Sequence, residues 1–335
     1  MHMDLSIVIV NWNGLSVLRD CLASIPSDLP GFDLEVIVVD NDSQDESVAM
    51  LRLEFPWVRV VVNSQNLGFA AGNNRGFATA RGRYVLLLNS DTLVLPGALA
   101  NSVRYLDENP QTGVLGCRIE FPDRSFQTSC YRFNNLIELF MVRLLPLGSV
   151  KNERLNYGRY WGCQFQEPTE VDVVAGCFMM VRREIILKSG GLDEDFFMYG
   201  EDEEWCSRIK RDGWKVIYYP AATIIHLHRF SSRQARRALQ VIECMSPLLV
   251  LHKRRGFMIA WLANWIMLCA LLVRLPVWLL LDGLHTIRGS AQEGLLRSRF
   301  AVTLAHVKGI FQPIWLPQKL ATAVVGDDRA TTEAT

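Results

Sequence analysis

The sequence predicts an α/β fold with a mostly parallel central sheet, followed by a C-terminal helical, membrane-associated extension. The first observation is a series of short apolar runs typical of buried strands, at 5–10, 35–39, 58–62, 84–88 and 113–119. The second is that amphipathic segments with helical spacing separate these runs, and this alternation favours βαβ units with right-handed crossovers. The third is a change to an uncharged, strongly apolar composition near the C-terminus.

Three helices are expected between the first strands. Leucines recur at helical spacing over 15–25, after the first strand. Ser43 and Glu46 have the spacing of a capping box and predict the start of the second helix. Pro96 predicts the start of the third.

The second half of the predicted sheet is less regular. Residues 120–170 lack clear periodicity, which predicts a long irregular insert. An apolar strand pattern returns over 171–181, a polar helix follows near 201–212, and two strands are expected near 215–219 and 223–226.

Charge and cysteine usage exclude several classes of protein. The chain has 335 residues, with 35 Lys plus Arg and 35 Asp plus Glu, so no overall field attracts nucleic acid. The eight cysteines are scattered without Cys-x-x-Cys pairs and suit reduced, buried thiols. Because a strand-like run begins almost at once and no signal-peptide pattern precedes it, we expect the catalytic part to stay in the cytosol.

The C-terminal apolar segment predicts contact with a membrane. Residues 257–273 carry no charge, but Arg274 and Pro276 interrupt the run, and basic residues flank it at 252–255 and at Arg288. Positive flanks on both sides favour a broken, re-entrant or in-plane helix over a single crossing. The alternative is a buried core helix or a helix through which two copies associate.

Polar residues follow three of the predicted strands. They are Asn11 and Asn13 after the first, 40–43 after the second, and 89–92 after the fourth. The ligand crevice of an open parallel sheet lies at these carboxyl ends. One such residue is often only a turn or a helix cap. Three converging strand ends favour a ligand site.

The glycine-rich segment 66–76 has neither the spacing of a dinucleotide-binding turn nor the ending of a P-loop. Its Gly68, Gly72, Asn73 and Arg75 could line a nucleotide and its diphosphate. A glycine-rich helix packed tightly against the sheet explains the same pattern, and this alternative stays open.

Carboxylates and aromatic side chains interleave over 190–205. A solvated helix start would explain the acidic residues, because Asp and Glu favour a first turn. It would not explain Phe196, Phe197, Tyr199 and Trp205 among them. The combination suits a sugar-binding cleft whose apolar wall excludes water and raises the basicity of a carboxylate.

The chain resembles family 2 glycosyltransferases of GT-A fold, in their bacterial rhamnosyltransferase-like branch. The resemblance covers residues 4–232 and includes His226. Its motifs are SIVIVNWNG, VIVVDNDSQD, NLGFAAGNNRG, LLLNSDT, VAGCFMMVRRE and GGLDEDFFMYGEDEEWCSRIKRDGWKVIYYP.

The resemblance implies a role for each matching residue on the donor side. It places Asp40 at the nucleobase, Asp42 at the ribose, and Gly72 and Asn73 in the donor loop. Asn11 and Asn89, at the ends of neighbouring strands, complete this donor-binding set.

For the metal, the resemblance implies that Asp91 is the binding carboxylate for Mg²⁺ or Mn²⁺ and that His226 completes the site. The family motif often has acidic residues on both sides, whereas here it is Asn89-Ser90-Asp91, so Asp91 alone supplies charge. His228, two residues after His226, is a competing candidate.

On the acceptor side, the resemblance makes Asp202 the general base and gives Glu201 and Asp193 the task of orienting the acceptor. A sugar hydroxyl attacks an anomeric carbon only as its proton is accepted, and direct displacement inverts the configuration there.

The resemblance also implies the partners. They are a nucleotide diphosphate sugar donor, with dTDP-rhamnose favoured, a lipid-linked glycan acceptor and the membrane surface at the cytoplasmic face of a bacterial inner membrane. A catalytically silent scaffold that binds nucleotide-sugar or lipid is the alternative. We expect a catalytic domain over 4–235, with donor and acceptor halves at 4–120 and 120–235, a membrane-associated helical region over 236–318, and a disordered tail over 319–335.

Overall fold

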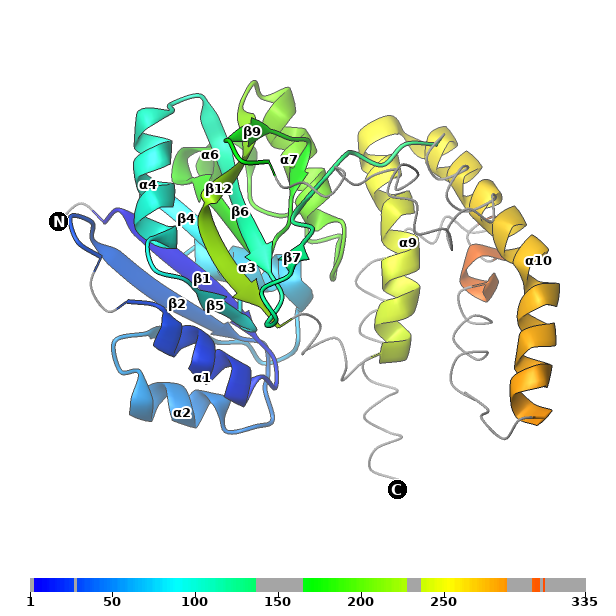
Figure 1. Ribbon diagram of the computed structural model, residues 1–335, viewed down its shortest axis with the longest axis horizontal. Helices are drawn as coiled ribbons and strands as arrows, with labels where there is room; N and C mark the ends of the chain where they lie inside the picture. The colour runs from blue at the N-terminus through cyan, green and yellow to red at the C-terminus, as the bar shows by residue number, and fades with distance from the viewer. Residues whose placement is uncertain are drawn as a thin grey trace. The chain divides into compact units, whose positions relative to one another are not determined.

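The computed structural model describes residues 3–26, 29–136, 165–227, 236–287, 303–307 and 310. The chain falls into two compact units (Figure 1). Unit 1 contains residues 1–133, 162–197 and 201–234, and unit 2 contains residues 134–161, 198–200 and 235–335. The predicted tail at 319–335, most of the predicted insert and His228 lie outside the described residues.

Unit 1 is organised by one sheet in which strands far apart in sequence pair. The order is β3-β2-β1-β4-β11-β6-β12-β5, and β7 and β9 pair at the side with β6 and β12. The strands are β1 (Leu5–Asn11), β2 (Leu34–Asp40), β3 (Arg59–Val62), β4 (Tyr84–Asn89), β5 (Thr92–Val94), β6 (Thr112–Glu120), β7 (Phe126–Gln127), β9 (Thr169–Glu170), β11 (Phe178–Arg182) and β12 (Lys215–His226). A separate pair consists of β8 (Cys130–Tyr131) and β10 (Val173–Val174).

The parallel part of the sheet sets the position of the ligand crevice. Strands β1, β2, β3 and β4 run parallel, whereas β11 runs antiparallel between β4 and β6. The chain leaves β1 toward β2 on one side, and β4 later pairs on the other side. The carboxyl ends of β1 and β4 therefore flank a topological switch point, where ligands bind in open α/β sheets.

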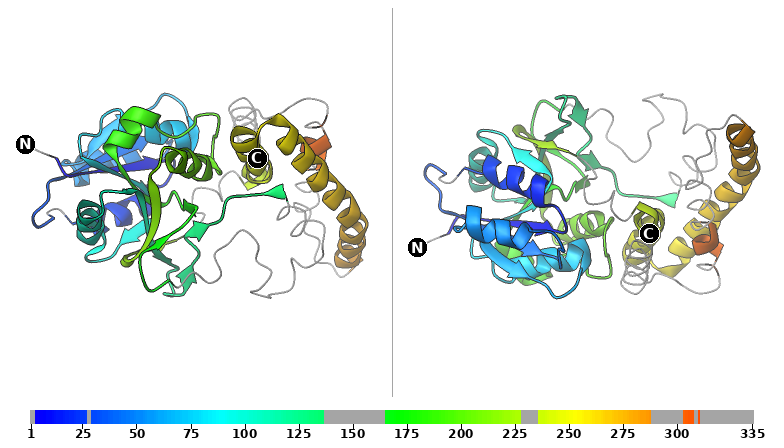
Figure 2. Two further views of the ribbon diagram at one scale, coloured as in Figure 1. Left: turned by 90° about the horizontal axis from the view of Figure 1, so that it is seen from above. Right: turned by 90° about the horizontal axis from the view of Figure 1, so that it is seen from below.

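Helices cover both faces of this sheet (Figure 2). On one face, Leu5, Ile7 and Ile9 of β1 pack in the main core with residues of three helices. These are α1 (Leu15–Ser24), α2 (Ser47–Glu54) and α4 (Ala98–Glu108). The alternate residue Val8 points to the other face, toward α3 (Gly68–Phe77). Helices α6 (Arg183–Ser189) and α7 (Glu201–Arg211) complete unit 1.

The predicted strands and helices of the first half are present, but the capping box is wrong. Helix α2 begins at Ser47 after an N-cap position at Glu46 with no side-chain cap. The Ser43 hydroxyl instead accepts hydrogen bonds from the Asn13 N–H and from Asn11 Nδ2. At the start of α2, Asp45 and not Ser43 provides the acceptor: its Oδ1 accepts from the Ser47 N–H.

Three further elements differ from the predictions. The strand expected over 171–181 is two strands, β10 and β11, separated by a segment that contains Gly176. The two strands expected after α7 are one, β12, with register shifts that include one between Tyr219 and Thr223. Helix α6 was not predicted.

Unit 2 contains two long helices that pack on each other. Helices α9 (Arg236–Arg255) and α10 (Phe257–Ile287) meet at Gly256, whose positive φ of 87° suits a sharp helix end. Small residues of α10, among them Ala260 and Ala263, pack on Leu248 and Leu251 of α9. The predicted break at Arg274 and Pro276 is wrong, because α10 continues through both. One proline removes a single backbone donor, and the neighbouring leucines favour a helix.

Candidate active site

The carboxyl ends of β1, β2 and β4 bring the predicted donor residues together. Asn11 pairs with Asp40 in the register of β1 and β2, and the preceding residue of β1 pairs with Asn89 of β4. Asn11 and Asp40 are buried, and Asn89 is half-buried. Their adjacency follows from the parallel sheet, as the sequence predicts.

A hydrogen-bond network fixes the turns that follow these strands. The Asp40 carboxylate accepts from Asn11 Nδ2 at 3.1 Å and from the Ser43 N–H at 2.9 Å. Asn13 Oδ1 accepts from the Gln44 N–H at 2.7 Å. Asn13 and Asp42 both have positive φ, a conformation that Asn and Asp tolerate better than most residues. Asp40 therefore holds the two turns together, and Asp42 lies partly exposed beside them.

The glycines of α3 are explained first by packing. A Cβ at Gly72 would lie 3.0 Å from Val10, and one at Gly76 would lie 2.3 Å from Val8. A Cβ at Gly68 would lie 2.4 Å from the Phe197 carbonyl oxygen. Asn73 is buried and donates to the Phe69 carbonyl, whereas Arg75 is exposed. The packing alternative thus accounts for the glycines, and their contact with a donor stays a prediction.

Asp91 and His226 lie side by side at the end of the sheet. Strand β12 pairs with β5 so that His226 lies opposite Thr92, and the Leu227 N–H donates to the Asp91 carbonyl. His226 Nε2 is 3.2 Å from Asp91 Oδ1 and 3.4 Å from Asn89 Nδ2. Gln127 contacts the other ring nitrogen of His226 at 3.1 Å.

This arrangement fits two ligands of one divalent ion. Neighbouring ligands of an octahedral Mg²⁺, bound at about 2.1 Å each, lie about 3 Å apart. Within the described part of the chain, no group of three or more His, Cys, Asp or Glu side chains suits a metal. Asp91 and His226 suit an ion that also binds ligands from outside the protein, as Mg²⁺ does with substrate phosphates.

Asp202 lies at the start of α7, across the segment that joins β10 to β11. Its Oδ2 accepts from the Gly176 N–H at 3.4 Å, and its Oδ1 accepts from the Glu203 N–H at 2.8 Å. Cys177, which follows Gly176, accepts a hydrogen bond on its carbonyl oxygen from the Asn89 N–H at 3.1 Å. Burial and the negative charges of Asp91 and Asp202 raise the pKa of the Cys177 thiol. The two carboxylates therefore flank one short segment.

Glu201 and Asp202 differ in their surroundings. Glu201 is buried, and among the described side chains none hydrogen-bonds its Oε2. Burial, followed by the charge of Asp202, raises the pKa of Glu201 to about 8. Burial also raises the pKa of Asp202, but the N–H groups of Glu203 and Gly176 oppose that rise. Glu201 and Asp202 therefore form a buried pair in which burial raises the pKa of both carboxyl groups, and only Asp202 has backbone N–H groups that favour its charged form.

The raised pKa of Glu201 predicts how stability depends on pH. The pKa of Glu201 rises on folding from 4.5 to about 8, so the folded chain binds the proton more tightly than the unfolded chain. Its contribution to stability is complete below the unfolded pKa and is lost as pH rises through the folded pKa. Between about pH 4.5 and about pH 8, the melting temperature of the wild type should fall relative to that of Glu201→Gln. Parallel melting curves for the two proteins across this range would contradict the assignment.

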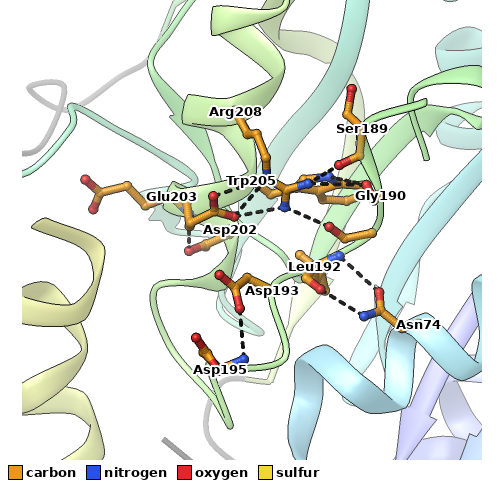
Figure 3. A network of polar contacts seen from close by, with 12 residues as sticks. Asn74, Ser189, Gly190, Leu192, Asp193, Asp195, Asp202, Glu203, Trp205 and Arg208 are labelled. Carbon is orange, nitrogen blue, oxygen red and sulfur yellow. Dashed lines mark hydrogen bonds and ion pairs between the residues drawn. The ribbon is translucent and has the colours of Figure 1, made fainter. Parts of the chain in front are cut away.

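Asp193 lies in the acidic loop, which we define as residues 190–197 between α6 and α7. Its Oδ1 accepts from the Asp195 N–H at 2.9 Å (Figure 3). The side chain is partly exposed, in contrast to buried Phe196 and Phe197. The aromatic residues of this loop thus form its inner side, while carboxylates point outward.

Sequence reasoning missed three residues that hold this site in place, Asn74, Arg208 and Gln127. Asn74 bonds the backbone of the acidic loop, and Gln127 orients His226. Arg208 bonds a carbonyl at the start of the loop, as does Nε1 of the predicted Trp205. Asn74 lies inside the NLGFAAGNNRG motif, but its partner is 118 residues away. No local signal in the sequence indicates such a pairing.

Comparison with known proteins agrees with this geometry. The sequence model described as "Glycosyl transferase family 2" matches residues 6–190. A Mycobacterium tuberculosis N-acetylglucosaminyl-diphospho-decaprenol L-rhamnosyltransferase is 28% identical over 210 residues, which are 58% of this chain and 66% of that protein. The Escherichia coli rhamnosyltransferase WbbL is 27% identical over 173 residues, which are 50% of this chain and 63% of that protein. Both matches span slightly less than two thirds of the relative.

Solved structures share the fold. GalNAc-T7 with UDP, GalNAc and Mn²⁺ has a TM-score of 0.57 at 19% identity, covering 75% of this chain and 48% of that one. The Pyrobaculum calidifontis mannosyltransferase PcManGT, in complex with GDP-Man and Mn²⁺, has a TM-score of 0.53 at 17% identity, covering 94% and 88%. The predicted GT-A fold with a mostly parallel central sheet is thereby confirmed. The chain belongs to glycosyl transferase family 2.

Proposed function

We propose that the chain transfers rhamnose from dTDP-rhamnose to a lipid-linked saccharide during synthesis of a bacterial surface polysaccharide. The observation that carries this proposal is the arrangement of the Asp91–His226 pair and the Asp202 carboxylate around the Gly176–Cys177 segment. On one side of this segment, Asp91 and His226 suit a diphosphate with its cation. On the other side, Asp202 suits the role of proton acceptor. The rhamnosyltransferases among the relatives support the choice of sugar.

Residues of unit 1 would hold the donor. We assign the nucleobase to the turn at Asp40, the ribose to Asp42, and the diphosphate to the region of Asn89 and Asp91. The buried network of Asn11, Asp40 and Ser43 supports this assignment, because it presents rigid turns at the crevice. A preorganised site loses less entropy on binding than a flexible one.

Asp91 and His226 would hold a Mg²⁺ or Mn²⁺ ion on the donor diphosphate. When bound, such an ion neutralises charge that develops on the leaving diphosphate. Gln127 keeps the His226 ring in place through the nitrogen that faces away from Asp91. Partners of this kind orient a metal-binding histidine and fix its tautomer.

Asp202 would act as the base. Its carboxylate accepts hydrogen bonds from the Gly176 and Glu203 N–H groups, which favour its charged form. As the acceptor hydroxyl attacks the anomeric carbon, its proton moves to Asp202, the bond from that carbon to the diphosphate oxygen breaks, and the configuration inverts. Asp193 and the neutral Glu201 would orient the acceptor by hydrogen bonds.

The experiment that tests this function is a panel of nucleotide sugars with a lipid-linked saccharide acceptor, scored by release of the nucleotide diphosphate. We expect the fastest release from dTDP-rhamnose, only in the presence of acceptor and Mg²⁺ or Mn²⁺. If only another sugar nucleotide releases its diphosphate, that compound and not dTDP-rhamnose is the donor. No release from any donor would overturn the proposed function.

Unit 2 supports a place at the cytoplasmic membrane surface. The segment Phe257–Arg274 of α10 is long and apolar enough to cross a membrane, and 33% of it is buried in the protein. Its buried side packs on α9, while its other side exposes large apolar side chains. These are Phe257, Met258, Leu262, Trp265, Leu272 and Val273, and we call them the apolar face. Basic residues at 252–255 precede this face and complement anionic lipid. We propose that the helix lies in the interface plane, as in a peripheral or monotopic protein.

Single charges on the apolar face should weaken membrane binding. Met258 and Leu187 of α6 are both 67% exposed, so Met258→Glu and Leu187→Glu form a matched pair. We expect Met258→Glu to lower the fraction that sediments with vesicles containing anionic lipid, because a carboxylate does not enter the acyl region. Leu187→Glu should sediment like the wild type. Equal sedimentation of all three proteins would show that the apolar face does not contact lipid.

A further inference from the structure

Helix α3 lies between the sheet and the acidic loop. Its glycine side, Gly72 and Gly76, packs on the side chains of β1. Its other side carries Asn74 and Phe77, which contact the acidic loop and α7. The start of α3 also contacts the turn after β2 to which we assign the nucleobase, because Asn41 Nδ2 donates to the Gly68 carbonyl at 2.9 Å. The helix thus lies between the proposed donor site and the acidic loop.

Asn74 binds the acidic loop through its whole amide group. Its Nδ2 donates to the Leu192 carbonyl at 2.8 Å, and its Oδ1 accepts from the Leu192 N–H at 3.0 Å (Figure 3). The same Nδ2 donates to Glu194 Oε1 at 2.9 Å. The side chain therefore satisfies both the backbone N–H and the backbone carbonyl of Leu192, as a neighbouring strand would.

The close approach of the loop depends on Gly191. A Cβ on this residue would lie 2.2 Å from Asn74 Oδ1, well inside van der Waals contact. The φ of Gly191 is not among the positive ones, so space rather than backbone conformation requires glycine here. The fit of Asn74 against Gly191 is thus steric as well as polar.

Two more contacts tie α3 to the same region. The Phe69 N–H donates to the Phe197 carbonyl at 2.7 Å, at the far end of the acidic loop. The Phe77 ring stacks on Trp205 of α7, with centroids 5.7 Å apart. On the side of α7, Arg208 Nη2 donates to the Gly191 carbonyl at 2.8 Å. The acidic loop is therefore held between α3 and α7.

We propose that Asn74 is a positioning residue, which couples the state of the donor site along α3 to the placement of the acidic loop and, through α7, of Asp202. This inference rests on the proposed function and deepens it. A donor that binds beside the start of α3 restricts the motion of this helix. Through the hydrogen bonds of Asn74, it also restricts the acidic loop with Asp193 and the start of α7, where Asp202 lies.

Asn74→Leu removes all three hydrogen bonds and keeps the size of the side chain. We expect kcat to fall up to about 100-fold, because small misplacements of reacting groups have effects of this size. The dissociation constant for dTDP with MnCl₂ should change less than about threefold, since Asn74 has no assigned donor contact. Asn101→Leu is the matched control. It removes one long-range amide bond, 3.0 Å to the Ala221 carbonyl, in the same unit and away from the acidic loop.

A double-mutant cycle tests the steric part. Gly191→Ala places a methyl group against Asn74 Oδ1, so alone it should lower kcat as Asn74→Ala does. With Asn74→Ala in the same chain, the methyl group has room, and the combined loss should be clearly smaller than the product of the two single losses. Independent, multiplicative losses would overturn the steric coupling.

Hydrogen exchange gives a readout that does not depend on transfer. In the wild type, dTDP with MnCl₂ should slow amide exchange over 190–197, and in Asn74→Leu this protection should be lost while exchange over 34–40 still slows. Protection of the acidic loop that persists in Asn74→Leu, or that is absent in the wild type, would overturn the coupling. A wild type that shows the coupling yet releases no nucleotide diphosphate from any donor would instead overturn the proposed function.

Discussion

Asp202→Asn should bind the donor normally and transfer sugar about 10²–10⁴-fold more slowly than the wild type, the range of a positioned general base. The amide keeps the shape of the carboxylate but does not take a proton from the acceptor hydroxyl. It also replaces one acceptor oxygen by a donor, so one of the bonds from the Gly176 and Glu203 N–H groups is lost. Single-turnover kinetics with bound donor separate the chemical step from binding.

A carboxylate of the acidic loop provides the control for this variant. Asp195 is exposed and has no assigned role, so Asp195→Asn removes the same charge nearby and should leave kcat within about twofold, as most surface substitutions do. A melting curve shows whether Asp202→Asn is folded. Unchanged turnover in a folded Asp202→Asn would mean that another carboxylate, Glu201 or Asp193, is the base.

Asp91→Ala should abolish transfer and remove the dependence of donor binding on the metal. Asp91 is the one carboxylate in contact with His226 among the residues that the structure describes, so its loss removes the anionic ligand of this pair. Hard divalent ions need anionic oxygen ligands, and a single imidazole does not replace them. Titration with Mn²⁺ in the presence of dTDP measures the loss directly.

The fold should survive this substitution, because the Asp91 backbone carbonyl still accepts from the Leu227 N–H. Asp123→Ala, which removes an exposed carboxylate from the turn before β7, is the control and should bind Mn²⁺ as the wild type does. Full transfer by Asp91→Ala, or by the wild type in excess chelator, would contradict the metal assignment.

The strand ends of this fold could be predicted from the sequence because the apolar run of a strand and the polar residues after it are both local signals. An apolar run of β1 or β2 predicts a buried strand, and parallel pairing then brings Asn11 and Asp40 to one edge without further information. The same reasoning fails where two local signals compete. Ser43 has the spacing of a helix cap, yet its hydroxyl serves the Asn13 turn instead, 30 residues away in sequence.

The residues that hold the site together could not be predicted in this way. Gln127 reaches His226 across 99 residues, and Asn74 reaches Leu192 across 118. Neither amide has a local pattern that distinguishes it from a surface Asn or Gln. Their partners become visible only when the sheet order and the packing of α3 are known.

The anomeric configuration of the product tests the account most directly. A sugar transferred in one displacement, with Asp202 taking the proton of the acceptor, must emerge with the configuration opposite to that of its donor. The one-bond carbon–proton coupling at the anomeric centre of the purified product, compared with that of dTDP-rhamnose by NMR, reports it. We predict inversion. A product that retains the configuration of the donor would contradict the single displacement and the role of Asp202 in it.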